Sequence, residues 1–192
     1  MPKTEDQFKE AREIRKSEIK DTALDLFARF GYHSTSISKI AKEANMSKGL
    51  LYNYYDGKQD LLKDIIMTGF KKLTQLNNNN YETDEDIVQF IEKTIEEVKA
   101  SPAYWKLYFS LLLQPSVYES IIKDFTELFN NFFSKIVGYF QKKGVKNPVA
   151  EVLLLTASLD GVCMNYVSDT DFFPIDDIKE IYIERFKQTF CK

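Results

Sequence analysis

Histidine, glycine and cysteine are scarce in this chain of 192 residues, and their scarcity argues against most enzyme classes. The single histidine, His33, directly follows a Gly-Tyr turn, whereas metal centres and acid–base sites usually gather several ionisable groups. The seven glycines are scattered and form no phosphate-binding loop. Two Ser-x-x-Lys tetrapeptides, at 17–20 and 36–39, lack the other elements of a serine acyltransferase. We therefore expect no enzyme, no catalytic residue, no metal and no cofactor.

Long apolar runs and paired cysteines are also missing. The N-terminus is charged and lacks the apolar segment of a secretory signal. The most apolar region, 149–167, is interrupted by Glu151, Asp160 and Asn165, and we expect it to fall short of the roughly 20 residues that span a bilayer. The two cysteines, Cys163 and Cys191, fit a reducing compartment. These features predict a cytoplasmic protein with no membrane partner.

The net charge of −3 is unusual for a protein that binds nucleic acid, but the charge is unevenly distributed. Residues 1–57 hold ten Lys or Arg and nine Asp or Glu, a net charge of +1, which leaves −4 for residues 58–192. Any affinity for DNA must therefore come from the local placement of cations.

Residues 35–55 are the most informative segment and predict two short helices joined by a tight turn. Apolar residues at positions 37, 40, 41 and 44 form one stripe of a first helix, and Ser36 before them is a candidate N-cap. Asn45 suits the turn because asparagine tolerates left-handed geometry. Ser47 is a candidate cap for the second helix, which we expect Asp56-Gly57 to close with a positive φ at the glycine.

Helices on both sides are expected to support this pair. Upstream, apolar residues recur with helical spacing from Ile19 to Phe30, and Gly31 ends the stripe. Downstream, a second stripe runs from Leu61 to Leu73. Together these elements predict a small core over residues 14–65.

The second helix of the pair presents small, polar and cationic groups on its outward face, as a helix that enters the DNA major groove requires. Gly49 permits close approach of the backbone, Lys48 can bind phosphate or guanine, and the tyrosines can donate hydroxyl groups. From the residues alone, a pair of capped helices with a solvated polar face in an ordinary bundle explains the pattern equally well.

A resemblance decides between these alternatives. Phe27-Ala28-Arg29-Phe30-Gly31-Tyr32, the Thr35-Ser36 helix start, the Ile40-Ala41 pair, and the run from Gly49-Leu50-Leu51-Tyr52 to Lys58-Gln59-Asp60-Leu61 resemble the N-terminal domain of the tetracycline-repressor (TetR) family. The resemblance covers residues 14–66. It departs from the family pattern at Tyr55, where phenylalanine is usual, and at Met46 in the turn.

The resemblance implies a DNA-binding transcriptional regulator, most often a repressor, that acts as a homodimer on a palindromic operator. It assigns residues 1–57 to a helix-turn-helix domain and 58–192 to effector binding and dimerisation. Leu51 and Tyr55 are expected in the core. The residues expected to contact DNA are Ser36, Ser47, Lys48, Gly49, Tyr52, Tyr54 and Lys58. The alternative is a helical adaptor that binds only protein.

Residues 58–192 read as helices throughout, which predicts an all-α protein of nine helices, as the family fold implies. We expect breaks at Asn77–Asn80, Ser101-Pro102, Pro115, Gly144 and 169–174, with Ser116 capping the long helix that ends at Lys143.

The apolar segment 149–167 and the last helix are expected to pair with a second copy, although an intrachain core would explain the same pattern. The expected interface residues are Val152, Leu155, Leu159, Val162, Ile178, Tyr182 and Arg185.

The resemblance also implies an effector cavity among the C-terminal helices. Many aromatic residues lie there, and most are expected to be ordinary core. The residues expected to line a cavity for a small apolar or aromatic effector are Phe70, Trp105, Tyr108, Phe109, Phe129 and Met164.

Basic residues also precede the core, at Lys3, Lys9, Arg12, Arg15 and Lys16. They form either an arm along DNA phosphates or one side of a solvated helix held by pairs such as Glu5–Lys9.

Overall fold

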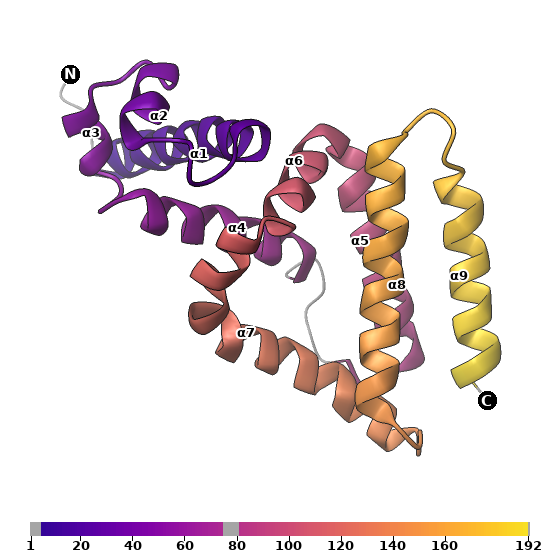
Figure 1. The fold of residues 1–192 in the computed structure, drawn as a ribbon. Helices are drawn as coiled ribbons and strands as arrows, with labels where there is room; N and C mark the ends of the chain where they lie inside the picture. The colour runs from indigo at the N-terminus through magenta and orange to yellow at the C-terminus, as the bar shows by residue number, and fades with distance from the viewer. Residues whose placement is uncertain (1–4, 75–80, 192) are drawn as a thin grey trace. The chain divides into compact units, whose positions relative to one another are not determined.

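The protein is all-α, as expected. The computed structural model describes residues 5–74 and 81–191, and these form nine α-helices (Figure 1). Their bounds are α1 Glu5–Phe30, α2 Ile37–Glu43, α3 Lys48–Tyr52, α4 Lys58–Thr74, α5 Asp84–Ala100, α6 Pro102–Leu112, α7 Pro115–Lys142, α8 Pro148–Ser168 and α9 Ile175–Phe190. The predicted Asn77–Asn80 loop falls among residues outside the described ranges.

Contacts divide the chain into two compact units. Unit 1 comprises 1–69 and 107–121, and unit 2 comprises 70–106 and 122–192. Unit 1 includes the first three turns of α4 and the end of α6, which the sequence boundary at 57/58 did not anticipate. The reason is a set of contacts such as the hydrogen bond from the Tyr108 hydroxyl to the Ile66 carbonyl, at 3.1 Å.

The core of unit 1 follows the predicted stripes. Ile19, Ala23, Leu26 and Phe27 of α1 are buried. They are joined by Ile40, Leu51, Leu61, Leu62 and Ile65 from the following helices. Phe30 is the exception, because it is 49% exposed at the end of α1 and lies under the Lys39 ammonium, 3.6 Å from the ring centroid.

The turn after α1 is fixed by polar contacts. Gly31 has φ +86°, a left-handed conformation that favours glycine. The buried hydroxyl of Thr35 donates to the Gly31 carbonyl at 3.0 Å. The Gln114 side chain accepts from the Tyr32 amide and donates to the Phe27 carbonyl, both at 2.9 Å. These bonds hold the entry to the helix-turn-helix in place.

In unit 2 the helix ends follow local rules. Thr83 and Asp86 form a reciprocal capping box at the start of α5. Gly144 follows the end of α7, as predicted, and has φ +70°. At the other end of α7, Pro115 is the first helical residue, so Ser116 lies inside the helix and does not cap it. Proline fits this position because its missing amide would have no partner there.

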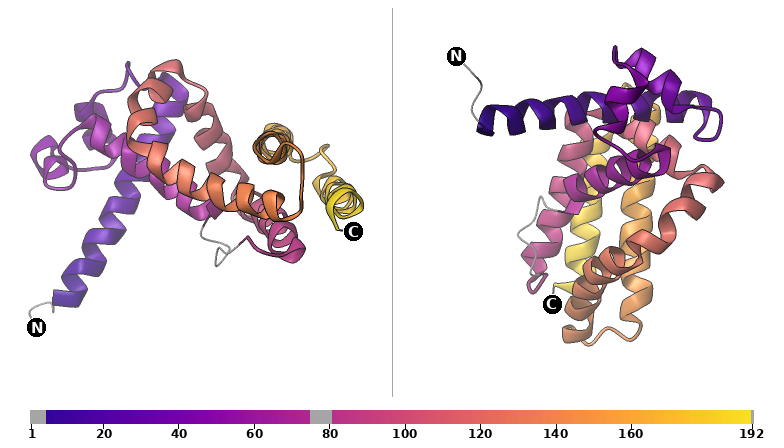
Figure 2. Two further views of the ribbon diagram at one scale, coloured as in Figure 1. Left: turned by 90° about the horizontal axis from the view of Figure 1, so that it is seen from below. Right: turned by 90° about the vertical axis from the view of Figure 1, so that its left-hand side faces the viewer.

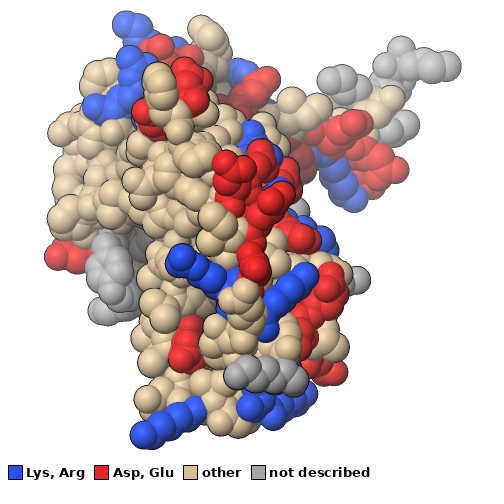
Figure 3. All heavy atoms as spheres, turned by 90° about the vertical axis from the view of Figure 1, so that its right-hand side faces the viewer, with Lys and Arg blue, Asp and Glu red and all other residues tan. Residues whose placement is uncertain are grey.

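Helices α5, α8 and α9 lie side by side in unit 2 (Figures 1 and 2). Trp105, the only tryptophan of the sequence, is fully buried, and its indole donates to the Glu97 carbonyl at 3.2 Å. The ammonium groups of Lys99 and Lys179 also join α5 to α9, since Lys99 lies 2.7 Å from Asp176 and Lys179 lies 2.6 Å from Glu96. Acidic and basic side chains are intermixed on the face in Figure 3, beside a broad area that has neither.

Helix α8, Pro148–Ser168, is longer and more apolar than expected for the segment 149–167. By length and composition it is the one helix among the described residues that could cross a membrane, because Glu151 and Asp160 are too few charges to exclude it. Only 22% of its most apolar 18-residue window is buried inside this chain. Most residues of this window are therefore at least partly exposed in a single copy.

Candidate nucleic-acid interface

The helix-turn-helix is built as its capping residues predict. The Ser36 hydroxyl accepts from the Lys39 amide at 3.2 Å, and the Ser47 hydroxyl accepts from the Leu50 amide at 3.1 Å. Asn45, in the turn between them, has φ +52°, the left-handed geometry expected there. Both serine caps are exposed, so the first turns of α2 and α3 face solvent.

The outward face of α3 is open. Lys48, Gly49 and Tyr52 are exposed, and no atom lies within 4 Å of the position that a Cβ on Gly49 would take. The Lys48 ammonium lies 5.9 Å from the Tyr52 ring centroid, which places a cation beside an exposed aromatic hydroxyl. The exposed residues of α3 therefore include the Lys48 ammonium and the Tyr52 hydroxyl as donors to DNA, beside Leu50, which is 40% exposed.

The end of α3 differs from the expectation. The helix stops at Tyr52, with Asn53 as its C-cap, several residues before Asp56-Gly57. Gly57 is not in the left-handed region, because the described glycines with positive φ are Gly31 and Gly144. The C-cap residue Asn53 is itself right-handed, so the helix needs no glycine there.

Leu51 and Tyr55 are buried, as predicted for the core side. The Tyr55 hydroxyl donates to the Asp64 carboxylate at 2.7 Å, and burial together with this bond raises the pKa of Tyr55. The Lys16 ammonium lies 5.1 Å from the Tyr55 ring centroid. The tyrosine thus fills an aromatic core position and gives its hydroxyl a fixed partner on α4.

Lys58 is turned inward, in a manner that the sequence did not reveal. Its ammonium donates to the carbonyl oxygens of Tyr32, Thr35 and His33, at 2.7, 3.0 and 3.3 Å. Burial lowers the pKa of Lys58. The lysine therefore ties the first turn of α4 to the loop before α2. Its contact with DNA phosphate stays a prediction.

The first turns of α1 are helical, and Lys9 pairs with Glu5 at 3.3 Å, as the solvated-helix alternative predicted. Arg12, however, reaches across to α3, where its Nη2 donates to the Asn53 carbonyl at 2.9 Å. Sequence reasoning missed this contact. A signal was available, because Arg12, Lys16 and Ile19 recur at i, i+4 and i+7 and so share the face of α1 that carries the core.

Comparison with known proteins identifies the family. Residues 19–65 match the sequence model of the tetR family of bacterial regulatory proteins. The chain is 30% identical over 130 residues to IcaR of Staphylococcus epidermidis, a negative transcriptional regulator of the helix-turn-helix type, and the match covers 65% of this chain and 69% of IcaR. This chain belongs to the TetR family.

Solved structures show the same fold. A transcriptional regulator from Pseudomonas aeruginosa PAO1 superposes with a TM-score of 0.75 at 19% identity, covering 92% of this chain and 90% of that one. A regulator from Aquifex aeolicus VF5 gives 0.66 at 25% identity, covering 92% and 99%. This TetR-family chain is a DNA-binding transcriptional repressor. TetR-family regulators are not enzymes; they are dimers that bind operators and small-molecule effectors.

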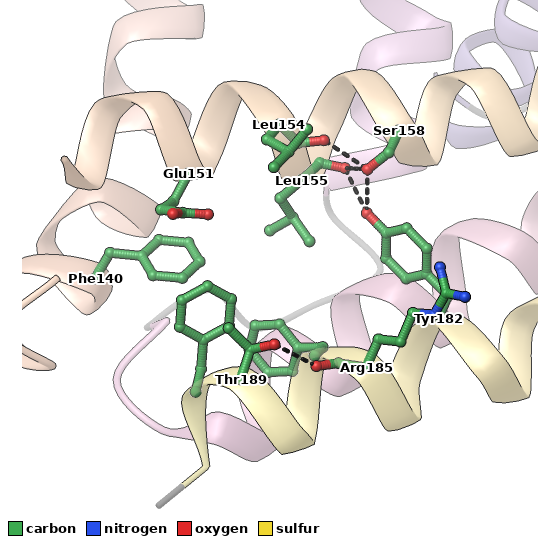
Figure 4. A pocket seen from close by; sticks show the side chains of 10 residues that line it. Phe140, Glu151, Leu154, Leu155, Ser158, Tyr182, Arg185 and Thr189 are labelled. Carbon is green, nitrogen blue, oxygen red and sulfur yellow. Dashed lines mark hydrogen bonds between the residues drawn. The ribbon is translucent and has the colours of Figure 1, made fainter. Parts of the chain in front are cut away.

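Unit 2 contains a pocket of about 260 Å³ between α7, α8 and α9 (Figure 4). Phe140, Leu155 and Phe186 give it an apolar lining, while Glu151 and Arg185 enter from opposite helices. The hydroxyl groups of Ser158 and Tyr182 are bonded to each other across it, at 2.6 Å.

None of the six residues predicted to line an effector cavity lines this pocket. Phe70, Trp105, Tyr108 and Phe109 are buried, Met164 is partly buried and Phe129 is 48% exposed. Phe70 and Phe129 belong to unit 2 and lie together, with ring centroids 4.7 Å apart. Tyr108 and Phe109 belong to unit 1. Their role in effector binding stays a prediction.

The predicted interface residues divide into two groups. Val152, Leu155 and Leu159 point into the core of unit 2 and are already covered by their own chain. Arg185 is exposed, and the others are partly exposed, namely Val162, Ile178 and Tyr182. The large apolar side chains that α8 leaves exposed are Val149, Leu153 and Leu154. The sequence pattern could not separate the two sides because α8 is apolar on both.

Proposed function

We propose that this repressor binds a palindromic operator as a homodimer through the exposed ends of α2 and α3, and that a small apolar or aromatic effector releases it. The proposed DNA contacts are Ser36, Ser47, Lys48, Gly49, Tyr52 and Tyr54, with Lys58 at their edge. We further propose 1–57 as the DNA-binding domain and 58–192 as the effector and dimerisation domain.

The observation that carries the proposal is the open first turn of α3. Lys48 and Gly49 are exposed next to the Ser47 cap, so a phosphate or a base edge can reach the backbone there. The positive charge of Lys48 at this exposed position favours a phosphate, and the missing side chain of Gly49 lets DNA come close to the backbone.

The test begins with a duplex selected from a random library by the unaltered full chain. Lys48→Ala should weaken binding to this duplex about tenfold and reduce the slope of log affinity against log salt by about 0.9 for each phosphate that the lysine neutralises. Lys42→Ala removes the same charge from an exposed position on α2 and serves as the control. Failure of the unaltered chain to enrich any sequence would refute the operator proposal.

The relatives suggest a first promoter to examine. IcaR of S. epidermidis is named as the negative regulator of the biofilm operon icaADBC. We therefore propose to test promoters of biofilm operons in the source organism, together with the DNA upstream of this chain's own gene. Footprinting with purified protein is expected to protect a two-fold symmetric site.

The proposed dimer surface is the exposed apolar side of α8 together with the neighbouring residues of α9. Leu153 and Leu154 are 54% and 65% exposed, and Leu154 also lines the pocket between α8 and α9. Leu154→Asp should shift the protein from dimer to monomer in light scattering after size exclusion. Leu113→Asp places the same charge on an exposed leucine in unit 1 and should leave the dimer intact.

Effector release is proposed through α4, which belongs to unit 1 up to Gly69 and to unit 2 from Phe70. An effector that prefers one arrangement of unit 2 could change operator affinity about 5–150-fold, the range for couplings of about 1–3 kcal/mol. A panel of apolar and aromatic compounds, screened by thermal shift, supplies candidates. A compound that binds and leaves operator affinity unchanged argues against release by that compound class.

A further inference from the structure

Helix α1 contacts the C-terminal end of α3, the helix proposed to bind DNA. Helix α3 has only five residues, and the last carbonyl groups of any helix lack partners within it. Arg12 supplies one partner, since its Nη2 donates to the Asn53 carbonyl at 2.9 Å. The same guanidinium lies 4.8 Å from the centroid of the Tyr54 ring. One side chain therefore caps the helix and covers the next aromatic residue.

A neighbouring arginine contacts the other end of α3. Arg15 Nη2 lies 3.4 Å from the carbonyl of Asn45, in the turn that precedes α3, and Arg15 also pairs with Glu18. Arg12 and Arg15 are three residues apart on α1, so they share one side of that helix. Arg12 and Arg15, one turn apart on α1, thus contact the residue that ends α3 and the turn that precedes it.

Arg12 lies outside the buried core of unit 1. It is exposed, and the first buried residue of α1 is Ile19, two turns later. It also lies outside residues 19–65, the segment that matches the family model. Its contacts are with the segment that follows α3, which carries Tyr54.

We propose that Arg12 is a positioning residue for operator binding, which acts by fixing the end of α3 and the Tyr54 ring. The inference rests on the proposed set of DNA contacts. A guanidinium suits this task because its planar fork can donate to a carbonyl while its face covers a ring. Loss of Arg12 frees the last turn of α3, so that Tyr54 no longer meets DNA in a fixed orientation.

The test uses the full chain and the duplex selected by the unaltered protein. We expect Arg12→Ala to weaken binding about tenfold, with an unchanged salt slope because the protein neutralises the same number of phosphates. The melting temperature should stay unchanged, and amide exchange should accelerate at Tyr54 and Tyr55, whose amides bond to the Leu51 carbonyl. Arg12→Lys keeps the charge but not the planar fork, and should recover part of the affinity.

Lys9→Ala is the matched control, since it removes the same charge one turn earlier on α1, where Lys9 pairs with Glu5. It should bind the duplex as the unaltered protein does. Three results would overturn the proposal: unchanged affinity of Arg12→Ala, a fall in its salt slope with full rescue by lysine, or an affinity loss matched by a lower melting temperature. If the unaltered chain selects no duplex, the operator proposal fails and this inference fails with it, a result distinct from the three above because it appears before any variant is compared.

Discussion

The ring of Tyr108 lies directly against Gly69, in the space that a Cβ at this position of α4 would occupy. The Tyr108 hydroxyl fixes the ring by donating to the Ile66 carbonyl, one turn earlier on α4. Helix α4 and the end of α6 can therefore pack closely within unit 1 only because residue 69 has no side chain.

Gly69→Ala should destabilise the protein by about 1–3 kcal/mol, because the added methyl group must push the Tyr108 ring away. Gly138→Ala is the matched control, since this glycine lies in α7 with nothing within 4 Å of the added Cβ. In the control, the better helix propensity of alanine should stabilise by about 0.5–1 kcal/mol. Urea unfolding of both variants measures the difference, and equal effects would contradict this account of Gly69.

Replacing Lys58 by methionine tests the three carbonyl contacts of its ammonium. Lys58→Met keeps an unbranched side chain but removes the donors to Tyr32, His33 and Thr35, and should cost about 1.5–3 kcal/mol of stability. Lys42→Met, at an exposed position of α2, should stay within about 0.5 kcal/mol of the unaltered protein. If the Lys58 variant unfolds at the same denaturant concentration, the ammonium has no structural role.

Asn45 tests the turn of the helix-turn-helix. Its φ of +52° suits asparagine or glycine, but a β-branched residue is strained there. Asn45→Val should therefore lower the free energy of unfolding by about 1–3 kcal/mol, and Asn45→Gly should change it little. Differential scanning calorimetry distinguishes the two variants, and equal melting temperatures would show that the turn relaxes without cost.

Acid sensitivity is predicted at the start of α5. The Lys143 ammonium, 2.6 Å from Asp84, lowers the pKa of that carboxyl, and the Tyr139 hydroxyl also donates to it at 2.9 Å. Because the pKa is lower in the folded state, the carboxylate stabilises the protein above its unfolded pKa of about 3.9. This contribution is lost as the pH falls through the lowered folded value.

Asp84→Asn should therefore be less stable than the unaltered protein at neutral pH, and the difference should disappear in strong acid. Unfolding by urea between pH 7 and pH 2 measures it. Asp171→Asn, in the exposed loop between α8 and α9, is the control and should follow the unaltered protein throughout. If the free energy of unfolding differed by the same amount from pH 7 to pH 2, the lost stability would come from the changed shape of the side chain and not from its charge.

Local signals predicted the fold well. The caps at Ser36 and Ser47, the glycines after α1 and α7 and the apolar stripes each act within one or two turns, so they could be predicted from the sequence. The contacts that could not be predicted from the sequence join residues that lie far apart along the chain. Gln114 bonds to backbone groups 82 and 87 residues away, and no local pattern marks it.

The candidate site shows the same limit. Exposure of Lys48 and burial of Leu51 follow from helical spacing, whereas the inward turn of Lys58 depends on a loop more than twenty residues earlier. Helix α8 is apolar on both sides, so its pattern could not tell Leu155, which its own chain covers, from Leu154, which remains exposed.

The buried indole of Trp105 makes unit 2 optically distinct. Because it is the only tryptophan in the sequence and belongs to unit 2, light that excites tryptophan and not tyrosine reports on the surroundings of this one side chain. Unfolding or compound binding near Trp105 can thus be followed in the unlabelled protein, with DNA present, by the wavelength and intensity of its fluorescence emission. Trp105 is therefore an intrinsic fluorescent probe in unit 2, the unit to which an effector is proposed to bind.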